Sequence, residues 1–328
     1  MANWRNRAKA ILGEPRAMRA VDRATSVALR VASPPYFFFT QLGPARLPSS
    51  TRSLKRMGLF PIRDHYYQPL FNDAHLTKSL AEVRRLPGID WRHKSQVSLL
   101  SELDFADELL ALHLDNPPKS DIDFFIENGA FASGDAEFLY SMIRHLKPGR
   151  VFEVGSGNST KIAQLALKRN ASETGLVAEH VCIEPYEMPW LEQLGVRVIR
   201  ERVEDVGCEL FGQLEPNDLL FIDSSHIIRP QGDVLFEYLE LLPSLSSGVF
   251  VHVHDIFTPR DYPEQWVRTN VCMWNEQYLL EALINSSDRY EIVAALNYLR
   301  HAEYKQLATV CPYLTKEREP GSFYIRIR

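Results

Sequence analysis

The sequence predicts an α/β fold built on a mostly parallel sheet. After Gly149, short apolar runs alternate with segments of helical periodicity, a pattern typical of parallel strands joined by crossover helices. The runs are apolar at nearly every position, as expected for strands covered on both faces. The last two runs, 290–298 and 321–328, have no clear helical segment between them, which predicts an antiparallel hairpin at the sheet edge. We therefore expect seven strands, with the final pair breaking the parallel order.

The segments before Gly149 predict helices and linkers. A basic segment with helical spacing, residues 6–32, is expected to end at the breaker formed by residues 33–35 (Ser-Pro-Pro). Residues 41–53 are rich in Pro and Ser and predict a loop. Residues 96–114 and 133–146 each predict an amphipathic helix.

These features divide the chain into three parts: a basic N-terminal helical extension with its linker (1–60), a helical cap (61–148) and the core (149–328). The core strands are expected over 150–154, 179–185, 196–203, 218–223 and 248–255, with helices over 159–169, 188–194, 232–245 and 275–286.

Composition is ordinary for a globular protein, with 328 residues, 45% apolar and 24% charged side chains. The longest apolar stretches are about ten residues, roughly half of what a transmembrane helix needs. The N-terminus is basic but has no continuous apolar segment of a signal peptide, so a cytoplasmic location is expected. The four cysteines are far apart and form no CxxC pair, which favours reduced, packed thiols.

Charge is unevenly distributed along the chain. Residues 1–60 carry eleven Lys or Arg against Glu14 and Asp22, a net +9, so the remainder has a net charge of −14 within a total of −5. The basic end is interpreted either as a solvated or loosely docked helix or as a peripheral contact with anionic lipid or an acidic partner, aided by the aromatic run at 36–39. Nucleic acid is not expected as a partner, because the acidic body would repel phosphates. A homo-oligomer is left open.

The loop after the first core strand has the composition of a nucleotide-binding loop. In the sequence FEVGSGNST, Glu153 ends the strand, and Gly155 and Gly157 allow a sharp turn into a helix whose N-terminal N–H groups are unpaired. Glu184 ends the next strand, where an acid can accept hydrogen bonds from both ribose hydroxyls. A dinucleotide fingerprint would have Gly or Ala at the position of Thr160, so S-adenosylmethionine is favoured over NAD.

From these residues, the chain over about 60–328 resembles class I S-adenosylmethionine-dependent methyltransferases, in particular bacterial small-molecule and sugar O-methyltransferases. The segments that carry the resemblance are FEVGSGNST, CIEP, ERVEDV, DLLFIDSSH and GVFVHVHDIF. It implies a Rossmann-like methyltransferase fold. It also implies a set of cofactor-binding residues: Glu153, Gly155, Gly157, Ser159, Glu184, Glu204, Asp205 and, in a segment (64–70) that closes over the cofactor, Tyr67. Ser159 departs from the third glycine of many members.

Polar side chains that end the fourth and fifth core strands are the candidates for chemistry. Asp223 follows one strand, and His254 and Asp255 follow the other, so all three are expected at the ligand-binding edge of the sheet. His226, in the loop after Asp223, is a candidate base for the acceptor proton. His252 lies one pleat deeper than His254 and is expected to give structural support.

These residues predict a metal-assisted acceptor site with Asp223, His254 and Asp255 as ligands and His226 as a nearby base or additional ligand. Some related O-methyltransferases use a carboxylate-rich Mg²⁺ site at corresponding strand ends, and an imidazole ligand makes Mn²⁺, Fe²⁺ or Zn²⁺ alternatives. In the metal-free alternative, His254 and Asp255 orient each other and His226 takes the proton.

The expected function is methyl transfer from S-adenosylmethionine to a polar small molecule, most simply the O-methylation of a sugar or other hydroxyl acceptor. Tyr262, Trp266 and Trp274 are candidates to line the acceptor pocket. The alternatives are an N-methyltransferase, a non-catalytic S-adenosylmethionine-binding protein at a membrane surface, and, more weakly, a nicotinamide oxidoreductase.

Overall fold

The computed structural model describes residues 15–62, 69, 71–186 and 188–328. The chain forms two compact units, residues 1–77 and 78–328. The division therefore falls after Thr77, and the segment 78–148 belongs to the same unit as the core. Tyr67, which the resemblance assigns to the cofactor site, lies outside the described residues.

The first unit contains α2 (Pro15–Leu42), α3 (Pro48–Arg56) and the short 3₁₀ helix η1 (Asp73–His75). The prediction that the first helix ends at residues 33–35 is wrong, because α2 continues through Pro34 and Pro35. A proline in a helix leaves the carbonyl four residues earlier without its N–H donor. Here the Ser33 hydroxyl donates to the Arg30 carbonyl at 2.9 Å and replaces the donor that Pro34 lacks. The far end of α2 is fixed by Phe39, which is buried and makes an edge-to-face contact with Phe60 at 5.9 Å.

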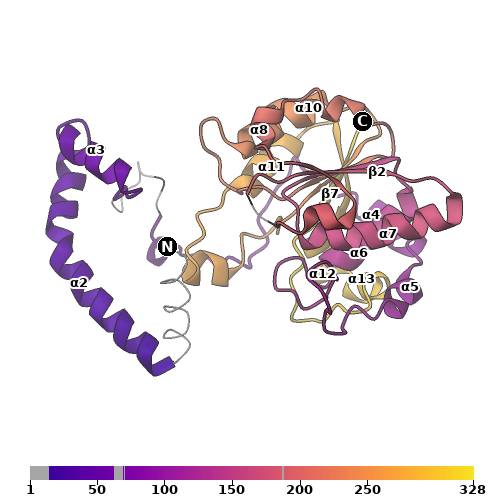
Figure 1. Ribbon diagram of the computed structural model, residues 1–328, viewed down its shortest axis with the longest axis horizontal. Coiled ribbons are helices and arrows are strands. Elements are labelled where there is room, and N and C mark those ends of the chain that lie inside the picture. The colour runs from indigo at the N-terminus through magenta and orange to yellow at the C-terminus, as the bar shows by residue number, and fades with distance from the viewer. Residues whose placement is uncertain (1–14, 63–68, 70, 187) are drawn as a thin grey trace. The chain divides into compact units, whose positions relative to one another are not determined.

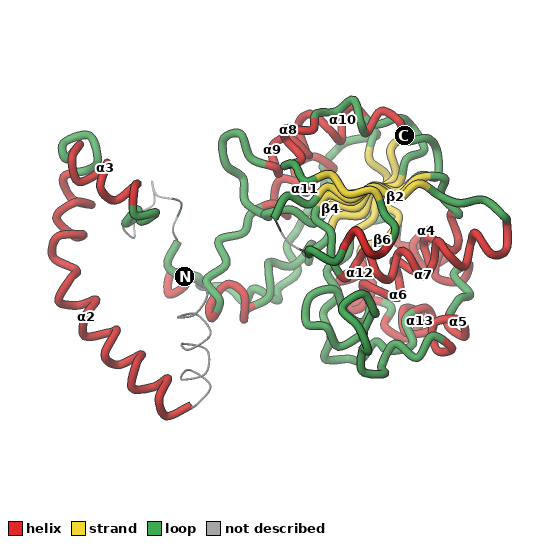
Figure 2. Tube along the Cα trace, in the orientation of Figure 1, coloured by secondary structure: helices red, strands yellow, loops and turns green. Residues whose placement is uncertain are grey.

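The second unit is a sheet with a layer of helices on each face (Figures 1 and 2). Its strands are β1 (Arg150–Val154), β2 (Glu179–Ile183), β3 (Arg197–Ile199), β4 (Leu219–Ile222), β5 (Phe250–Val253), β6 (Tyr290–Ala295) and β7 (Phe323–Ile327). Its α-helices are α4 (His93–Glu102), α5 (Ala106–Ala111), α6 (Asp135–Leu146), α7 (Asn158–Thr174), α8 (Val203–Val206), α9 (Asp233–Phe236), α10 (Leu242–Ser244), α11 (Glu276–Ile284), α12 (Leu296–Ala302) and α13 (Tyr304–Val310). Single turns of 3₁₀ helix lie at Leu191–Leu194 (η2) and Phe211–Gln213 (η3), and π-helical turns at Glu237–Leu241 (η4) and Gln265–Thr269 (η5).

The strand order β3-β2-β1-β4-β5-β7-β6 confirms the predicted seven-stranded, mostly parallel sheet. Strands β1 to β5 pair in parallel, and β7 pairs antiparallel with both β5 and β6. The final strands do not form a simple hairpin, since α12 and α13 connect them. Each of these helices has seven residues, about two turns, which is too short for a 3.6-residue period to be recognised in the sequence.

Alternate residues of each strand enter two separate apolar cores. Val151, Leu219 and Phe221 face the core that also contains the apolar sides of α6 and α7. Phe152 and Leu220 face the opposite core, toward α9 and α11. The strands are therefore apolar on both faces, which is why their sequences lack the polar alternation of a half-exposed sheet.

The structure also differs from the sequence prediction in the helical segment before the core. The single helix expected over 96–114 is two helices, α4 and α5, separated at Leu103–Phe105. Both Leu103 and Leu109 are buried, so the break turns the second helix while keeping its apolar side on the core.

Because β1, β2, β4 and β5 are parallel, their carboxyl ends meet at one edge of the sheet. Gly155 follows β1 and Asp223 follows β4 at this edge. Any side chain at position 155 would be strained, because its φ is +74° and a Cβ atom there would lie 1.8 Å from the Asp223 carbonyl oxygen unless the backbone shifted. The loop after β1 is thus packed directly against the end of β4.

Candidate active site

The glycine loop is held from below by Glu153. This carboxylate is fully buried and accepts a hydrogen bond from the Thr160 hydroxyl, whose oxygen in turn accepts from the Gly157 N–H at 3.1 Å. Cys182 donates to the same carboxylate at 3.6 Å. Glu153 does not line the cavities beside the loop. Its contacts stabilise the loop from inside the protein. The resemblance instead assigns Glu153 a direct contact with the cofactor.

A cavity of about 680 Å³ lies over the ends of β1, β2 and β4. Gly155, Glu184 and Glu204 line it, together with Arg202 and Ser225. The Glu184 carboxylate accepts from the Tyr186 N–H at 3.0 Å and from the Ser156 N–H at 3.4 Å, which holds it at the mouth of the glycine loop.

Asp205 is not among the lining residues, and its carboxylate instead pairs with Arg202 at 2.7 Å on the surface. Of the two acids that the resemblance places near the adenine, the structure therefore brings only Glu204 to the cavity.

A second cavity, of about 410 Å³, continues from the first and shares Gly155, Glu184, Asp223 and Ser224 with it. Gly157 and Ser159 line it on the side of the loop. Its apolar wall is formed by Phe131, Met188, Trp266 and Trp274, and its polar wall by Asp223, His254 and Asp255. Two of the three predicted aromatic residues line this space. Tyr262 is buried instead, where its hydroxyl oxygen accepts from the Gln277 N–H at 3.0 Å.

A third cavity, of about 530 Å³, shares Asn158 and Met188 with the second and extends it outward. Its lining contains Asp121, Asp123 and Trp190, and the Lys161 ammonium lies 4.2 Å from the centre of the Trp190 ring. The three cavities thus form one continuous path along the ends of the strands.

Among the described residues, one cluster of candidate metal ligands faces this path. It consists of Asp223, His226 and Asp255, whose ligand atoms all lie within 4.8 Å of one another. His226 Nε2 is 3.4 Å from the Asp223 carboxylate and 3.6 Å from the Asp255 carboxylate. The other ring nitrogen, Nδ1, is 2.7 Å from Glu276. The sequence prediction named His254 as a ligand and His226 as a nearby base or additional ligand. In the structure His226 lies beside both carboxylates, and His254 Nε2 lies 3.4 Å from Asp255.

Local backbone conformation brings these groups together. His226 has φ +60° and Asp255 has φ +59°, both in the left-handed region that non-glycine residues rarely adopt. The His226 carbonyl accepts from the N–H groups of Asn275 and Glu276 at the start of α11, which keeps the turn closed. The Trp274 ring lies against the His226 imidazole, with 4.3 Å between ring centres.

The electrostatics of the cluster favour a positive charge between the carboxylates. Burial alone would lower the pKa of His226, but hydrogen bonds and charge from Asp223 and Glu276 outweigh it and raise that pKa well above the ordinary value. Burial, reinforced by the neighbouring Asp223 carboxylate, raises the pKa of Asp255 to about 6. Asp223 and Asp255 are partly exposed and both face His226 Nε2, so a positive charge at this position, carried by the imidazole or by a bound cation, would offset the repulsion between the two carboxylates.

The two histidines of β5 have different surroundings. His254 lines the second cavity, and its Nε2 is 3.4 Å from Asp255. His252 is fully buried, stacks on Tyr324 with 4.2 Å between ring centres, and has a pKa held well below its ordinary value by burial. His252 is therefore a neutral, packed side chain, in the structural position predicted for it.

The second cluster of candidate metal ligands is Glu153, His180 and Cys182, buried between the sheet and α7. Gln164 lies 2.7 Å from His180 Nδ1, and Glu153 is bonded to Thr160 and Cys182. These bonds form a network beneath the glycine loop.

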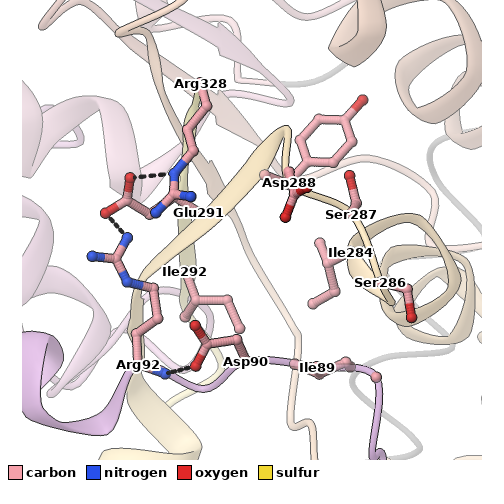
Figure 3. A pocket seen from close by; sticks show the side chains of 12 residues that line it. Ile89, Asp90, Arg92, Ile284, Ser286, Ser287, Asp288, Glu291, Ile292 and Arg328 are labelled. Atoms are coloured by element: carbon pink, nitrogen blue, oxygen red, sulfur yellow. Dashed lines mark hydrogen bonds and ion pairs between the residues drawn. The ribbon is translucent and has the colours of Figure 1, made fainter.

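A smaller cavity, of about 190 Å³, lies at the opposite edge of the sheet, beside the start of β6 and the end of β7 (Figure 3). Its charges are already paired: Arg92 contacts Glu291, and Arg328 donates to the same carboxylate at 2.9 Å. This notch is separate from the path described above.

Sequence reasoning missed Glu276 and Phe131. Glu276 is almost fully buried, accepts from the Tyr238 hydroxyl at 2.9 Å and orients His226. It lies 50 positions from His226 and begins a helix, where an acid is common for reasons unrelated to a site. No spacing in the sequence distinguishes it.

The sheet, the glycine loop and the acid after β2 define a class I S-adenosylmethionine-dependent methyltransferase. Residues 152–256, from β1 to just beyond β5, match the protein family described as "Methyltransferase domain". The chain is thus an enzyme of this class, and the predicted Rossmann-like methyltransferase fold is confirmed.

Other comparisons give weaker similarities. An uncharacterized protein of Archaeoglobus fulgidus is 26% identical over 171 residues, which cover 47% of this chain and 73% of that protein. A structure of CmcI with Mg and SAM has 11% identity and a TM-score of 0.36, covering 67% of this chain and 84% of that one. The plantazolicin methyltransferase BpumL in complex with SAH has 13% identity and a TM-score of 0.33, covering 72% and 99%. None of these similarities bears on the acceptor or on a metal.

Proposed function

We propose that the enzyme methylates a hydroxyl group of a polar small molecule, with a sugar as the favoured class, and that a divalent cation held by Asp223, His226 and Asp255 assists the reaction. The observation that carries this proposal is the orientation of His226. Its Nδ1 is bonded to Glu276, so Nε2 faces two carboxylates at 3.4 and 3.6 Å. A carboxylate behind a histidine that faces two further ligands is a common arrangement around protein metal ions.

The residues around the glycine loop fit S-adenosylmethionine. Glu184 stands where it can accept from ribose hydroxyls, and Glu204 lies further along the same cavity, on the side proposed for adenine. Gly155 and Gly157 line the cavities, so the backbone of the glycine loop borders the space proposed for the ligand. When bound, this donor supplies a sulfonium methyl group, which the acceptor oxygen displaces in line as the methyl–sulfur bond breaks.

The cluster fits a divalent cation in its donor set as well as in its geometry. Two carboxylate oxygens and one imidazole nitrogen suit Mn²⁺, Fe²⁺ or Zn²⁺, and Mg²⁺ fits less well because it prefers oxygen alone. A cation bound there would act as a Lewis acid that lowers the pKa of an acceptor hydroxyl. With a cation bound in place of the imidazole proton, Glu276 would accept from Nδ1–H and leave the Nε2 lone pair directed at the cluster.

The pocket lining indicates how the acceptor is positioned. Asp223 and Asp255 line the second cavity, while His226 lies behind them and does not line it. We therefore place His226 as a ligand and give the carboxylates the contact with the acceptor hydroxyl. Phe131, Trp266 and Trp274 exclude water from the opposite side, and flat aromatic faces suit the C–H faces of a sugar ring.

Hydroxyl acceptors are favoured over amines by the same cluster. An aliphatic hydroxyl must lose a proton to become a good nucleophile, whereas a neutral amine is nucleophilic already and gains little from a Lewis acid. N-methylation is accordingly the second choice. A non-catalytic role is not favoured, because it would not require the cluster of Asp223, His226 and Asp255 beside the cavity.

The proposal is tested by metal binding and turnover together. Mn²⁺ titration followed by electron paramagnetic resonance should give one tight site, lost in Asp255→Asn and His226→Ala. Asp288→Asn is the matched control, because Asp288 lines the notch at the opposite edge of the sheet. SAH affinity, measured by calorimetry, should stay unchanged in all three variants.

Turnover is then measured as SAH formed over a panel of sugars and amines, before and after EDTA treatment with Mn²⁺ or Mg²⁺ added back. Full activity without metal would refute metal assistance, and products methylated only at nitrogen would refute the hydroxyl assignment.

A further inference from the structure

We propose that α2 is a membrane-surface helix that lies in the plane of an anionic bilayer and anchors the enzyme there. The observation behind this proposal is the separation of arginine and apolar side chains on its two sides. It is independent of the acceptor chemistry and of the metal cluster.

The arginines of α2 lie in one narrow stripe. At about 100° per residue, Arg19, Arg23 and Arg30 fall within about 40° of one another around the helix axis. All three are exposed. No acidic residue shares the stripe, since Asp22 lies roughly 60° from its nearest arginine by the same geometry.

Over residues 18–31, most of the exposed apolar side chains occupy the opposite side of the helix, and Val27 is the exception, roughly 60° from the middle of the stripe. Val21 lies roughly 180° from the middle of the arginine stripe, and Met18, Leu29 and Val31 lie to either side of it. These residues are open to solvent, with Leu29 63% and Val31 76% exposed. Near the end of the helix this separation is lost: Phe37, 66% exposed, falls within the arginine stripe, and Phe38, 59% exposed, lies roughly 80° from its middle.

The surrounding segment has the same charge. Residues 15–62 contain Arg16, Arg19, Arg23, Arg30, Arg46, Arg52, Lys55 and Arg56, with Asp22 as the one acid. In α3 the basic residues fall on the side away from buried Leu54. The contact of Phe39 with Phe60 joins α2 to the segment after α3.

An anionic bilayer is the partner that satisfies both sides of α2. Arginines contact lipid phosphates while Met18, Val21 and Leu29 on the opposite side enter the boundary between headgroups and acyl chains. Nucleic acid would bind the arginines and leave the apolar side in water. A second copy would need a regular heptad seam, which Pro34 and Pro35 interrupt.

The helix lies on the membrane and does not cross it. Among the helices that the structure describes, none is both long and apolar enough to span a bilayer. A continuous arginine stripe is compatible with an orientation parallel to the surface, where every arginine reaches a headgroup.

The test is flotation of the full-length protein with vesicles of phosphatidylcholine alone or with added phosphatidylglycerol. We expect binding to the anionic vesicles only, reversed by high salt. Replacing Arg19, Arg23 and Arg30 together by Gln should weaken binding roughly 100-fold, taking about 1 kcal/mol for each arginine near the surface.

Val21→Glu should reduce binding by about tenfold or more, because it places a carboxylate on the inserted side. Ser26→Glu is its matched control: it makes the same charge change in the same helix, near the arginine stripe, and should cost about fivefold or less. Unchanged helix content and unchanged SAH affinity show that each variant is folded.

Equal binding to neutral vesicles, or equal losses in Val21→Glu and Ser26→Glu, would overturn the proposal. So would a dimer in sedimentation that Val21→Glu dissociates, since the apolar side would then be occupied by a second copy. Loss of turnover with vesicle binding intact would instead count against the proposed acceptor chemistry alone.

Discussion

Glu276→Gln tests the central feature of the proposed metal site. The substitution keeps the shape of the side chain but removes the charge that holds His226 Nδ1 at 2.7 Å. A glutamine can present either its oxygen or its NH₂ to the imidazole, so His226 loses its fixed tautomer. Loss of such an outer partner typically weakens metal binding 10- to 100-fold, which is about 1.4–2.7 kcal/mol. We expect the Mn²⁺ dissociation constant to rise within this range.

Glu237→Gln is the appropriate comparison. Glu237 is a fully buried carboxylate in the same layer, but it accepts from the Ser224 hydroxyl at 2.9 Å and makes no hydrogen bond to His226. Mn²⁺ affinity should change by less than about threefold in this variant, and both proteins should keep their SAH affinity. If Glu276→Gln binds Mn²⁺ as tightly as the parent protein, or if the two variants lose affinity equally, the role assigned to Glu276 is wrong.

Three further predictions concern the donor site, the glycine loop and the N-terminal unit. Glu184→Ala should weaken SAH binding by about 2–4 kcal/mol, counting hydrogen bonds from two ribose hydroxyls to a charged acceptor, and calorimetry with unchanged affinity would remove Glu184 from the site. Gly155→Ala should lower the free energy of unfolding by about 3 kcal/mol, because strain at φ +74° adds to overlap with the Asp223 carbonyl, whereas Gly175→Ala has the same φ and open space and should lose roughly 1–2 kcal/mol in urea titrations. Deleting residues 1–60 should leave a folded protein that binds SAH, since residues 78–328 form a compact unit, and circular dichroism showing an unfolded product would contradict this.

The sheet and the location of the site could be predicted because both depend on local patterns. Strands that are apolar on both faces can be recognised in the sequence as short, continuous apolar runs. The carboxyl ends of parallel strands share one edge of the sheet, so Asp223 and Asp255 were correctly expected to lie close together. The strand period shows where His254 lies, but no pattern in the sequence reveals the left-handed turn that places His226 Nε2 near both carboxylates. Glu276 reaches the cluster from a distant helix, and that contact exists only in the tertiary structure.

Two other differences between prediction and structure arise because a side chain forms a hydrogen bond that the sequence pattern does not indicate. Pro34 did not end α2, since the Ser33 hydroxyl supplies the bond that proline removes. Glu153 has the sequence position of a ligand-binding acid, yet Thr160 and Cys182 engage its carboxylate from the side of α7. A sequence gives the position of an acid along its strand and leaves open which neighbour will bind it.

The contact between Gly155 and Asp223 has a thermodynamic consequence. The Asp223 carbonyl packs against the loop proposed to receive the methyl donor, while its carboxylate belongs to the cluster proposed to hold the cation. One residue therefore lies between the two proposed sites, and a shift of the loop toward β4 would be transmitted to Asp223. Any free energy transmitted between the two ligands through Asp223 is reciprocal: the factor by which the donor tightens cation binding equals the factor by which the cation tightens donor binding. Measuring SAH affinity with and without Mn²⁺ gives that factor directly, without an acceptor being known.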